Sequence, residues 1–299
     1  AGRDRVLLRI DDRRHPRVGK KYRVWPMLEF SWAVDDYLLG ITHILRGKQL
    51  VIEDMMEEFI WEKLGWPKKV FVHHGMVRIK DVEGKLSKTE TRKLVQKKVY
   101  TGWDDQRSWS LQALARRGIQ PEAIKNFVVS LGLSLADIEI PAEILYAENR
   151  KLIDAKANRY FAVVDPVEIS VMKAPKIKNV KINLHPDFPK RGRRKIPVSA
   201  KKIFAERADF EKFYEQDVGL INLFAINLKK DARFVSKEIG YNLQKIHWVS
   251  AKNIKMKIVM PDGKIVAALA EKDVKNLKKG SLIQFYRVGF CRVDKVGKE

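Results

Sequence analysis

The segment Gly84-Lys85-Leu86-Ser87-Lys88-Thr89-Glu90 sets two lysines around a serine, directly before a helix predicted over residues 91–98. The free N–H groups and the dipole of a helix N-terminus attract anions, and the two ammonium groups add to that attraction. The segment is therefore a candidate phosphate site. Ser87 and Glu90 also fit a capping box, in which each side chain bonds a backbone N–H group at the helix start. On that second interpretation the lysines are only solvated.

The residues before this segment predict part of an α/β fold. Apolar runs over residues 6–10, 22–27 and 40–45 are typical of strands. A helix follows, closed by Gly65 and Pro67, in which apolar residues recur at helical spacing. These residues are Ile52, Met55, Met56, Phe59 and Ile60. We expect half of a parallel sheet here, within a domain over residues 1–100.

Residues 101–165 predict a small helical subdomain. Helices are expected over residues 110–117, 121–131 and 142–160, because Gly118, Gly132 and Pro141 supply ordinary helix boundaries. The segment carries a net charge of only −1, from 8 lysines and arginines against 9 aspartates and glutamates. Its near-neutral charge suits a spacer better than a binding platform.

Residues 166–299 predict β-structure with a basic surface. Charged and apolar residues alternate over residues 167–171, 255–260 and 282–288, and Pro261-Asp262-Gly263 forms a turn signal. Several short strands separated by turns indicate two antiparallel β-barrels. The fold class is therefore multidomain: α/β, then α, then β.

The charge of the chain points to a polyanionic partner. Its 299 residues include 60 lysines and arginines against 37 aspartates and glutamates, a formal net charge of +23. Residues 1–100 contribute +8 and residues 166–299 contribute +16. This balance favours nucleic acid first and an anionic membrane second. With no long apolar run and no signal-peptide pattern at the N-terminus, we expect a cytoplasmic protein without a membrane span.

Missing motifs exclude several kinds of site. Cys291 is the only cysteine, so intrachain disulfides and cysteine-cluster zinc sites are excluded. The sequence has no Walker-type phosphate loop, no G-x-S-x-G elbow and no histidine pair at metal-binding spacing. We expect no protein-bound metal.

An ordered series of motifs resembles one family. Residues 85–89 resemble the KMSKS signature of class I aminoacyl-tRNA synthetases, and residues 102–107 resemble the G-W-D-D-P-R motif of glutamyl- and glutaminyl-tRNA synthetases. The other resemblances are Trp25-Pro26-Met27-Leu28-Glu29-Phe30 with Asp36, Gly40-Ile41-Thr42-His43-Ile44-Leu45-Arg46-Gly47, Arg116-Arg117-Gly118-Ile119, Asp165-Pro166-Val167, His185-Pro186 with Arg191-Gly192, and Ile246-His247-Trp248-Val249. The resemblance implies the second half of a class I Rossmann-type catalytic domain (1–100), a helical stem-contact subdomain (101–165) and anticodon-binding β-barrels (166–299).

The chain departs from this family pattern at three points. Gln106 stands where the family usually has proline, and Leu28 stands where glutaminyl enzymes have a tyrosine that contacts the amino acid. No histidine fits the H-x-G-H motif that class I enzymes carry earlier in the chain. We therefore expect the C-terminal half of a larger enzyme, whether an expressed part, a proteolytic product or one subunit of a split enzyme. The missing N-terminal half would act in cis or in trans.

Arg46 favours glutamate over glutamine as the substrate. It follows a candidate strand at the end where α/β sheets bind ligands, and glutaminyl enzymes resemble this segment with a small uncharged residue there. A guanidinium can hold a carboxylate through two hydrogen bonds and offers no acceptor to an amide. The alternative is an ion pair with Asp35, Asp36 or Glu53.

The resemblance implies a two-step reaction, in which ATP activates L-glutamate and the acyl group passes to the terminal adenosine of tRNA(Glu). Whether tRNA(Gln) is also charged stays open. Lys88 would meet the charge that develops on pyrophosphate, with Lys85 and Ser87 in support, and Mg2+ would accompany ATP. Gly47, Met76, Val77 and Leu86 would lie against ATP, although Met76 and Val77 also fit a buried strand. His43 fits a substrate-pocket residue or a core histidine equally well.

For tRNA, the resemblance and the charge pattern together suggest a set of basic residues. Arg159 matches an arginine that contacts the anticodon in glutaminyl enzymes. The other candidates are Arg107, Arg116, Arg117, Arg191, Arg193, Arg194, Lys229 and Lys230. Two alternatives to a glutamate-tRNA ligase remain, a tRNA-binding module without catalysis and a fragment of a glutaminyl-tRNA synthetase.

Overall fold

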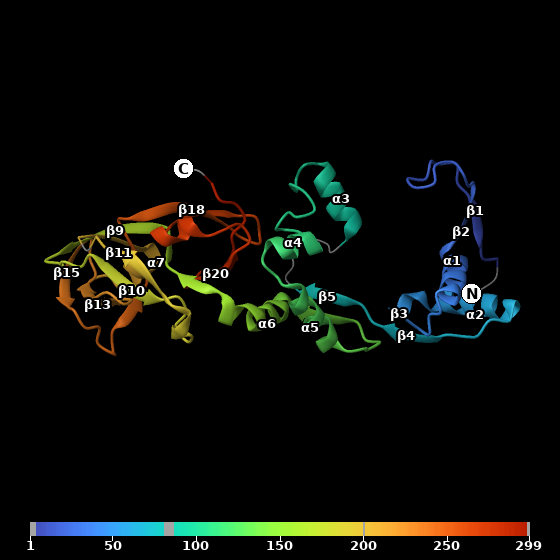
Figure 1. The fold of residues 1–299 in the computed structure, drawn as a ribbon, viewed down its shortest axis with the longest axis horizontal. Coiled ribbons are helices and arrows are strands. Elements are labelled where there is room, and N and C mark those ends of the chain that lie inside the picture. Colours follow the sequence, from blue (N-terminus) through green and yellow to red (C-terminus); the bar gives the residue numbers. More distant parts are fainter. Residues whose placement is uncertain (1–3, 81–86, 200, 298–299) are drawn as a thin grey trace. The chain divides into compact units, whose positions relative to one another are not determined.

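The computed structural model describes residues 4–80, 87–199 and 201–297 (Figure 1). Its internal contacts divide the chain into two compact units, Ala1–Asp81 with Val128–Ala142, and Val82–Phe127 with Glu143–Glu299. In the described residues, none of the helices is both long enough and apolar enough to cross a membrane.

The first unit contains short two-stranded sheets and two helices. Its elements are β1 (Leu8–Ile10), β2 (Val24–Pro26), α1 (Leu28–Leu38), β3 (His43–Gly47), η1 (Lys48–Leu50), α2 (Val51–Leu64), β4 (Val70–His74), β5 (Val77–Lys80) and β6 (Ile138–Pro141). β3 pairs with β4 in parallel, as β5 does with β6, whereas β1 pairs with β2 antiparallel. The three predicted strands are therefore present, but only β3 among them pairs in parallel, and its partner β4 follows α2.

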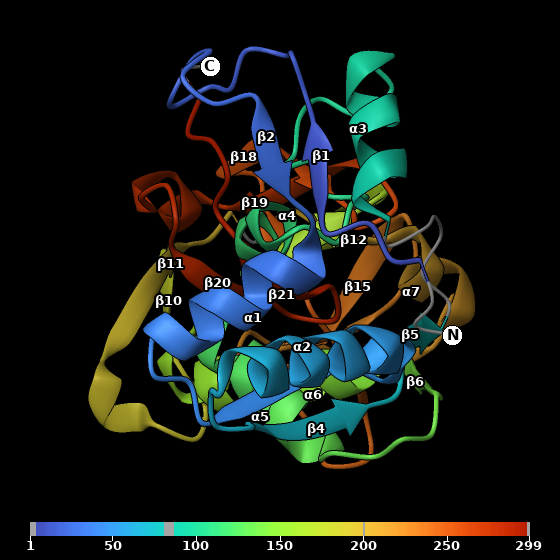
Figure 2. The same cartoon turned by 90° about the vertical axis from the view of Figure 1, so that its right-hand side faces the viewer.

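The two helices pack on each other over a small apolar core. Figure 2 shows α1 beside α2. Trp61 of α2 is fully buried and donates from Nε1 to the carbonyl oxygen of Ala33 in α1 at 2.8 Å. Ile44 of β3 and Ile60 of α2 complete the core. Gly65 ends α2 with φ +66°, a left-handed conformation that favours glycine, as its sequence position predicted.

Short helices with side-chain caps begin the described part of the second unit. Ser87 accepts a hydrogen bond from the Glu90 backbone N–H and starts α3 (Lys88–Gln96). Ser110 accepts from the Ala113 N–H and starts α4 (Leu111–Arg116). The boundary between the units falls within α5 (Pro121–Leu131), and α6 (Ala142–Ile153) follows β6.

The helix predicted to reach residue 160 ends earlier. After α6 come a 3-10 turn, η2 (Asp154–Lys156), and strand β7 (Asn158–Tyr160). β7 pairs in parallel with β20 (Leu282–Phe285), more than a hundred residues away. A local helical pattern could not show this distant partner, so the predicted C-terminal end of that helix was wrong.

The rest of the second unit is mostly β-structure around a large apolar core. Its further elements are β8 (Ala162–Val164), β9 (Pro166–Met172), β10 (Asn179–Asn183), η3 (Pro189–Arg191), β11 (Arg193–Pro197), β12 (Lys202–Glu206), α7 (Arg207–Lys212), β13 (Asp217–Leu220), β14 (Ala225–Asn227), β15 (Asp231–Ser236), β16 (Gln244–Ile246), β17 (Val249–Ser250), β18 (Asn253–Val259), β19 (Ile265–Glu271), η4 (Lys272–Asn276) and β21 (Gly289–Arg292). Phe161, Phe224 and Trp248 are fully buried in the core.

The sheets differ from the two antiparallel barrels expected. The largest has the order β16-β13-β14-β15-β9-β12-β17, and among the described residues nothing pairs its two edges into a closed barrel. The pairs β13/β16, β15/β9 and β20/β7 are parallel. The alternating pattern identified strands correctly, and it carried no information on their partners. The predicted turn at 261–263 does join β18 to β19, with Gly263 at φ +90°.

Candidate functional site

Arg46, on β3, lies at the centre of a buried ionic network in the first unit. Its side chain is 9% exposed. Nη1 and Nη2 donate to Oε1 and Oε2 of Glu57 at 2.6 and 3.1 Å, and Nη1 lies 3.0 Å from Oδ1 of Asp54. Both acids come from α2. His73, the β4 residue paired with Arg46, hydrogen-bonds the other Asp54 oxygen through Nε2.

Aromatic rings and burial shape the properties of this network. The Arg46 guanidinium carbon lies 4.9 Å from the ring centre of Trp32 and 5.1 Å from that of Phe71, within cation–π range. Burial raises the pKa of Glu57 above its ordinary value, although the Arg46 hydrogen bonds act in the opposite direction. One guanidinium thus faces two carboxylates. The hydrogen-bonded partners of Arg46 are not the acids considered from sequence, and any substrate carboxylate must share the guanidinium with Glu57 and Asp54.

The other predicted pocket residues of the first unit lie near the same strands. His43 begins β3, is exposed, and has Nδ1 3.0 Å from the Thr42 hydroxyl. Gly47 ends β3 and is buried, and a Cβ added there would lie 2.3 Å from Gln49 Oε1. Met76 and Val77 are 48% and 41% exposed, so they are not the buried strand considered as an alternative.

The predicted phosphate loop is described only in part. Lys85 and Leu86 lie outside the described residues. Ser87 caps α3, which is the serine half of the predicted capping box, whereas the Glu90 carboxylate accepts a hydrogen bond from Lys93. Lys88 is the first residue of the helix. The two interpretations of this segment are compatible, because a capped helix N-terminus still carries the adjacent ammonium group.

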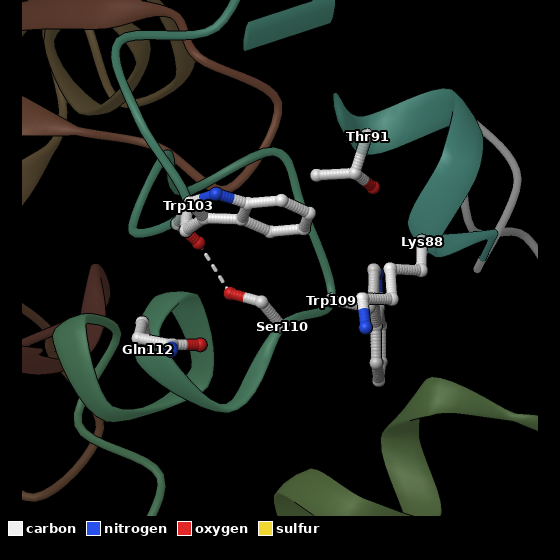
Figure 3. Close-up of a pocket in the computed structure, with 6 residues that line it drawn as sticks. All are labelled: Lys88, Thr91, Trp103, Trp109, Ser110 and Gln112. Carbon is white, nitrogen blue, oxygen red and sulfur yellow. Dashed lines mark hydrogen bonds between the residues drawn. The ribbon is translucent and has the colours of Figure 1, made fainter. Parts of the chain in front are cut away.

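Lys88 borders an open hollow of about 410 Å3 within the second unit. Figure 3 shows Lys88 and Thr91 of α3 on one side, and Trp103, Ser110 and Gln112 on the other, with Trp109 near Lys88. The Trp103 carbonyl oxygen accepts hydrogen bonds from the hydroxyls of Ser108 and Ser110. The Trp109 indole therefore lies beside the lysine of the predicted phosphate loop, and the Trp103 indole lies across the hollow from it.

A hydrogen-bonded turn centred on Asp105 lies between Trp103 and Trp109 in the chain. Asp105 is fully buried and accepts two hydrogen bonds from the Arg107 guanidinium at 2.8 Å each, together with the backbone N–H groups of Thr101 and Arg107. Burial alone would raise the pKa of Asp105, but these hydrogen bonds outweigh it and hold the pKa well below the ordinary value. Arg107 also donates to the Val99 carbonyl oxygen at 2.6 Å. The arginine of the predicted motif thus stabilises the turn.

Three protein-family models match this chain. Residues 1–155 match the catalytic domain of tRNA synthetases class I (E and Q). Residues 157–246 and 245–294 match two anticodon-binding domains of the same family. The chain belongs to the class I (E and Q) tRNA synthetases. The resemblance predicted from the ordered motifs is confirmed.

Individual relatives of this synthetase chain are archaeal. It is 40% identical to the glutamate-tRNA ligase of Pyrococcus abyssi, over 100% of this chain and 54% of that protein. It is 38% identical to that of Methanocaldococcus jannaschii, over 98% of this chain and 54% of that protein, and 39% identical to that of Archaeoglobus fulgidus, over 99% and 53%. The chain therefore spans about half the length of the curated relatives it matches.

Among solved structures, a glutamate tRNA ligase from Elizabethkingia meningosepticum is similar over 44% of this chain and 31% of its own. The identity is 20% and the TM-score 0.33.

Most of the arginines predicted to bind tRNA already have internal partners in this synthetase. Arg116 donates to Asp294 from Nε at 3.0 Å and Nη2 at 2.7 Å. Arg191 donates to the carbonyl oxygens of Ala155 and Lys156 just after α6. Arg159 donates to Asp154 at 3.1 Å, and Arg193 to Asn183 at 3.1 Å.

Arg194 is a structural residue. It is 4% exposed and donates from Nε to Glu271 Oε1 at 2.6 Å, and from Nη1 to the Asn183 carbonyl oxygen at 2.7 Å. Burial raises the pKa of Glu271 to about 7 despite this partner. A guanidinium enclosed in this way cannot reach a tRNA phosphate, so the expectation for Arg194 is corrected.

Lys229 and Lys230 remain accessible on the β-sheet part. Lys230 is exposed, and Lys229 is half-buried with its Nζ 3.1 Å from Glu215 Oε1. A second hollow of about 490 Å3 lies near β13 and β16. Its lining includes Asn222, Lys237 and Lys245, whose amide and ammonium groups suit an anionic, hydrogen-bonding ligand.

One group of possible metal ligands occurs in the described part of the chain, formed by Glu206, Asp209 and His247. Arg287 donates to both carboxylate oxygens of Asp209, and His247 Nε2 lies 2.8 Å from the Ala162 carbonyl oxygen. These groups already have partners. We assign them no metal.

The sequence did not single out Asp54, Glu57 or Trp109. The two acids stand three positions apart in a predicted helix, a spacing that puts them on one face. This spacing could have identified Asp54 and Glu57 as a pair of neighbouring carboxylates. No periodic signal marked Trp109, because its role depends on how the turn at 103–110 meets α3.

Proposed function

We propose that this chain forms part of a glutamate-tRNA ligase. The observation that carries the proposal is its similarity of about 40% identity to archaeal enzymes of that name, over essentially the whole chain. The reaction joins the glutamate α-carboxylate to the α-phosphate of ATP, releases pyrophosphate, and transfers the acyl group to the terminal adenosine of tRNA. ATP enters with Mg2+ as substrate, and the enzyme acts in the cytoplasm.

For the activation step, we assign Lys88 to the charge that develops on pyrophosphate. Its position at the start of a Ser87-capped helix supports this role, because the helix N-terminus and the ammonium group both favour phosphate. Lys85 and Leu86 are assigned by the family motif alone. Such an interaction lowers the activation barrier when it is stronger in the transition state than in the ground state.

For the amino acid, we assign Arg46 to the γ-carboxylate of glutamate, with His43 nearby. Gly47, Met76 and Val77 are assigned to ATP. The pairing of Arg46 with Glu57 and Asp54 fixes the orientation of the guanidinium and lowers its net attraction for a further anion. Selection against glutamine would then depend on the guanidinium hydrogens left available, since an amide nitrogen cannot accept them.

For tRNA, we assign the exposed Lys230 and the half-buried Lys229 to phosphates and Arg159 to the anticodon region. The match of residues 157–294 to anticodon-binding domains supports this assignment. We keep Arg116, Arg117, Arg191 and Arg193 as weaker candidates, since ion pairs, ring contacts or hydrogen bonds already engage them. Arg107 acts through the turn that it stabilises.

We retain the three sequence segments, 1–100, 101–165 and 166–299, as the functional division. Activity requires the H-x-G-H half, in cis or in trans. The test is ATP–pyrophosphate exchange and tRNA charging by this chain with that half supplied, using glutamate and glutamine in parallel. Charging with glutamate supports the proposal, and charging with glutamine alone would overturn it in favour of a glutaminyl enzyme.

A tRNA-binding module without catalysis is the second candidate. It is favoured by the match of residues 157–294 to anticodon-binding domains, which concerns tRNA binding alone. The same exchange assay separates the two, because a binding module would bind tRNA and give no exchange even with the other half present.

A further inference from the structure

The hollow beside α3 has no role in the reaction proposed above, apart from the presence of Lys88 at its border. We propose that it binds an unpaired nucleotide of tRNA, whose base stacks on the indole ring of Trp109, with the Trp103 indole on the other side of the hollow (Figure 3). This inference rests on the proposed function, since it presumes tRNA as the ligand.

The lining has the chemistry of a nucleotide site. Trp103 is 37% exposed, although an indole is among the side chains that gain most from burial. Beside the two indoles are the Lys88 ammonium, the hydroxyls of Thr91 and Ser110, and the Gln112 amide. An indole accepts the flat face of any base, and hydroxyl and amide groups can bond its edge, while the Lys88 ammonium stays assigned to pyrophosphate. The volume, about 410 Å3, lies within the range of small-ligand sites.

The rings are held before any ligand arrives. The hydroxyls of Ser108 and Ser110 fix the Trp103 carbonyl group, and Ser110 at the same time caps α4. Asp105 and Arg107 close the intervening turn. A platform that is already ordered loses little conformational entropy when it binds, which favours a stacking role over a loosely packed surface.

A buried positive charge supports the ring of Trp109. The Arg117 guanidinium carbon lies 4.8 Å from the ring centre, and its Nη1 donates to the Tyr146 hydroxyl at 3.3 Å. Nε and Nη2 of Arg117 are buried and have no hydrogen-bond partner among the described residues. Burial lowers the pKa of this arginine. A cation over the Trp109 ring adds positive potential there, which favours an anionic ligand such as a nucleotide over a neutral aromatic one.

The test measures binding of a tRNA(Glu) transcript to the complete chain at several salt concentrations. Trp109→Ala should raise the dissociation constant by roughly 5- to 100-fold, the usual effect of removing one base-stacking ring. Trp109→Phe keeps a stacking ring and should bind within about threefold of the unchanged chain. The slope of affinity against salt should stay the same, because no phosphate contact is removed. Leu111→Ala is the matched control, since Leu111 is 68% exposed on α4 and does not line the hollow.

A second variant keeps the test decisive if Trp109→Ala fails to fold. Gln112→Trp fills the exposed side of the hollow and leaves both indoles in place, so it should weaken tRNA binding while far-UV circular dichroism and thermal unfolding stay unchanged. Equal tRNA affinity in Gln112→Trp, Trp109→Ala and the unchanged chain would overturn the inference. If the unchanged chain itself fails to bind tRNA, the proposed function is what fails.

Titration with AMP distinguishes a free mononucleotide as the occupant. We expect no quenching of tryptophan fluorescence by millimolar AMP that depends on Trp109. Such quenching, combined with tRNA affinity that Trp109→Ala leaves unchanged, would show that the hollow takes a mononucleotide and that its assignment to tRNA is wrong.

Discussion

Arg46 and Glu57 form a two-point hydrogen-bonded pair inside the first unit, with Nη1 to Oε1 at 2.6 Å and Nη2 to Oε2 at 3.1 Å. The pair joins β3 to α2, and Asp54 adds a second carboxylate to the same guanidinium. The residue that sequence reasoning assigned to the substrate is therefore also part of the structural core. Its loss has consequences for stability as well as for any substrate role.

Replacement of Arg46 should destabilise the chain. Arg46→Ala leaves two buried carboxylates without a counter-charge, which typically costs about 3–5 kcal/mol, whereas Arg46→Lys keeps the charge and should lose less. Urea unfolding followed by fluorescence measures the difference. The control is Arg13→Ala, which removes a surface pair with Asp11 and should cost far less, because solvent screens such a pair. Equal effects of Arg46→Ala and Arg13→Ala would contradict a structural role for the buried network.

Replacement of Lys88 should slow activation without weakening ATP binding. If the ammonium acts on the leaving pyrophosphate, Lys88→Ala in the complete enzyme should lower kcat for ATP–pyrophosphate exchange by roughly 100- to 1,000-fold, with KM for ATP changed by less than about threefold. Lys93→Ala is the control, because Lys93 lies on the same helix in an exposed pair with Glu90. A large rise in KM at unchanged kcat would instead assign Lys88 to ground-state binding.

Replacement of Lys230 should weaken tRNA binding in a salt-dependent way. Removing one phosphate contact should reduce the slope of log affinity against log salt by about 0.7–0.9. Filter binding of tRNA(Glu) across a series of KCl concentrations measures this slope. Lys125→Ala, in an exposed pair with Glu122 on α5, should leave it unchanged. An unaltered slope for Lys230→Ala would remove this lysine from the proposed contact surface.

Glu271 should make stability fall as the pH rises from about 4.5 to 7. Burial raises the pKa of its carboxyl from 4.5 to about 7 in the folded chain, so the folded state binds the proton more tightly than the unfolded state. The stabilisation is complete below pH 4.5 and is lost as the pH rises through 7, by up to about 3 kcal/mol. Glu271→Gln lacks this titration. Urea unfolding at several pH values should therefore show the free energy of unfolding of the unchanged chain falling relative to the variant, and parallel curves would exclude a raised pKa.

The sequence alone determined the family and most of the local structure. The motifs from residue 25 to residue 249 follow the order in which the synthetase family carries them, and this order can be seen in the sequence alone. Capping residues are local as well, so Ser87, Ser110 and Gly65 marked real helix boundaries. The alternation of charged and apolar residues identified β9, β18 and β20 for the same reason, because it reflects which residues of a strand face the core.

Only the tertiary structure decided which groups meet. Strand pairing depends on partners far apart in the chain. For this reason the structure has open sheets with parallel pairs where barrels were predicted, and β7 where the helix after residue 142 was predicted to continue. The same holds for charge. From the sequence, Arg46 was predicted to bind the substrate and Arg194 to bind tRNA, because a sequence gives the charge of an arginine but not its neighbours in the fold. In the folded chain, Glu57 and Asp54 of α2 lie against Arg46, and Glu271 of β19 lies against Arg194. A buried guanidinium needs carboxylates or carbonyl oxygens within hydrogen-bonding distance. Those neighbours therefore determine whether the guanidinium remains available to a substrate or to tRNA.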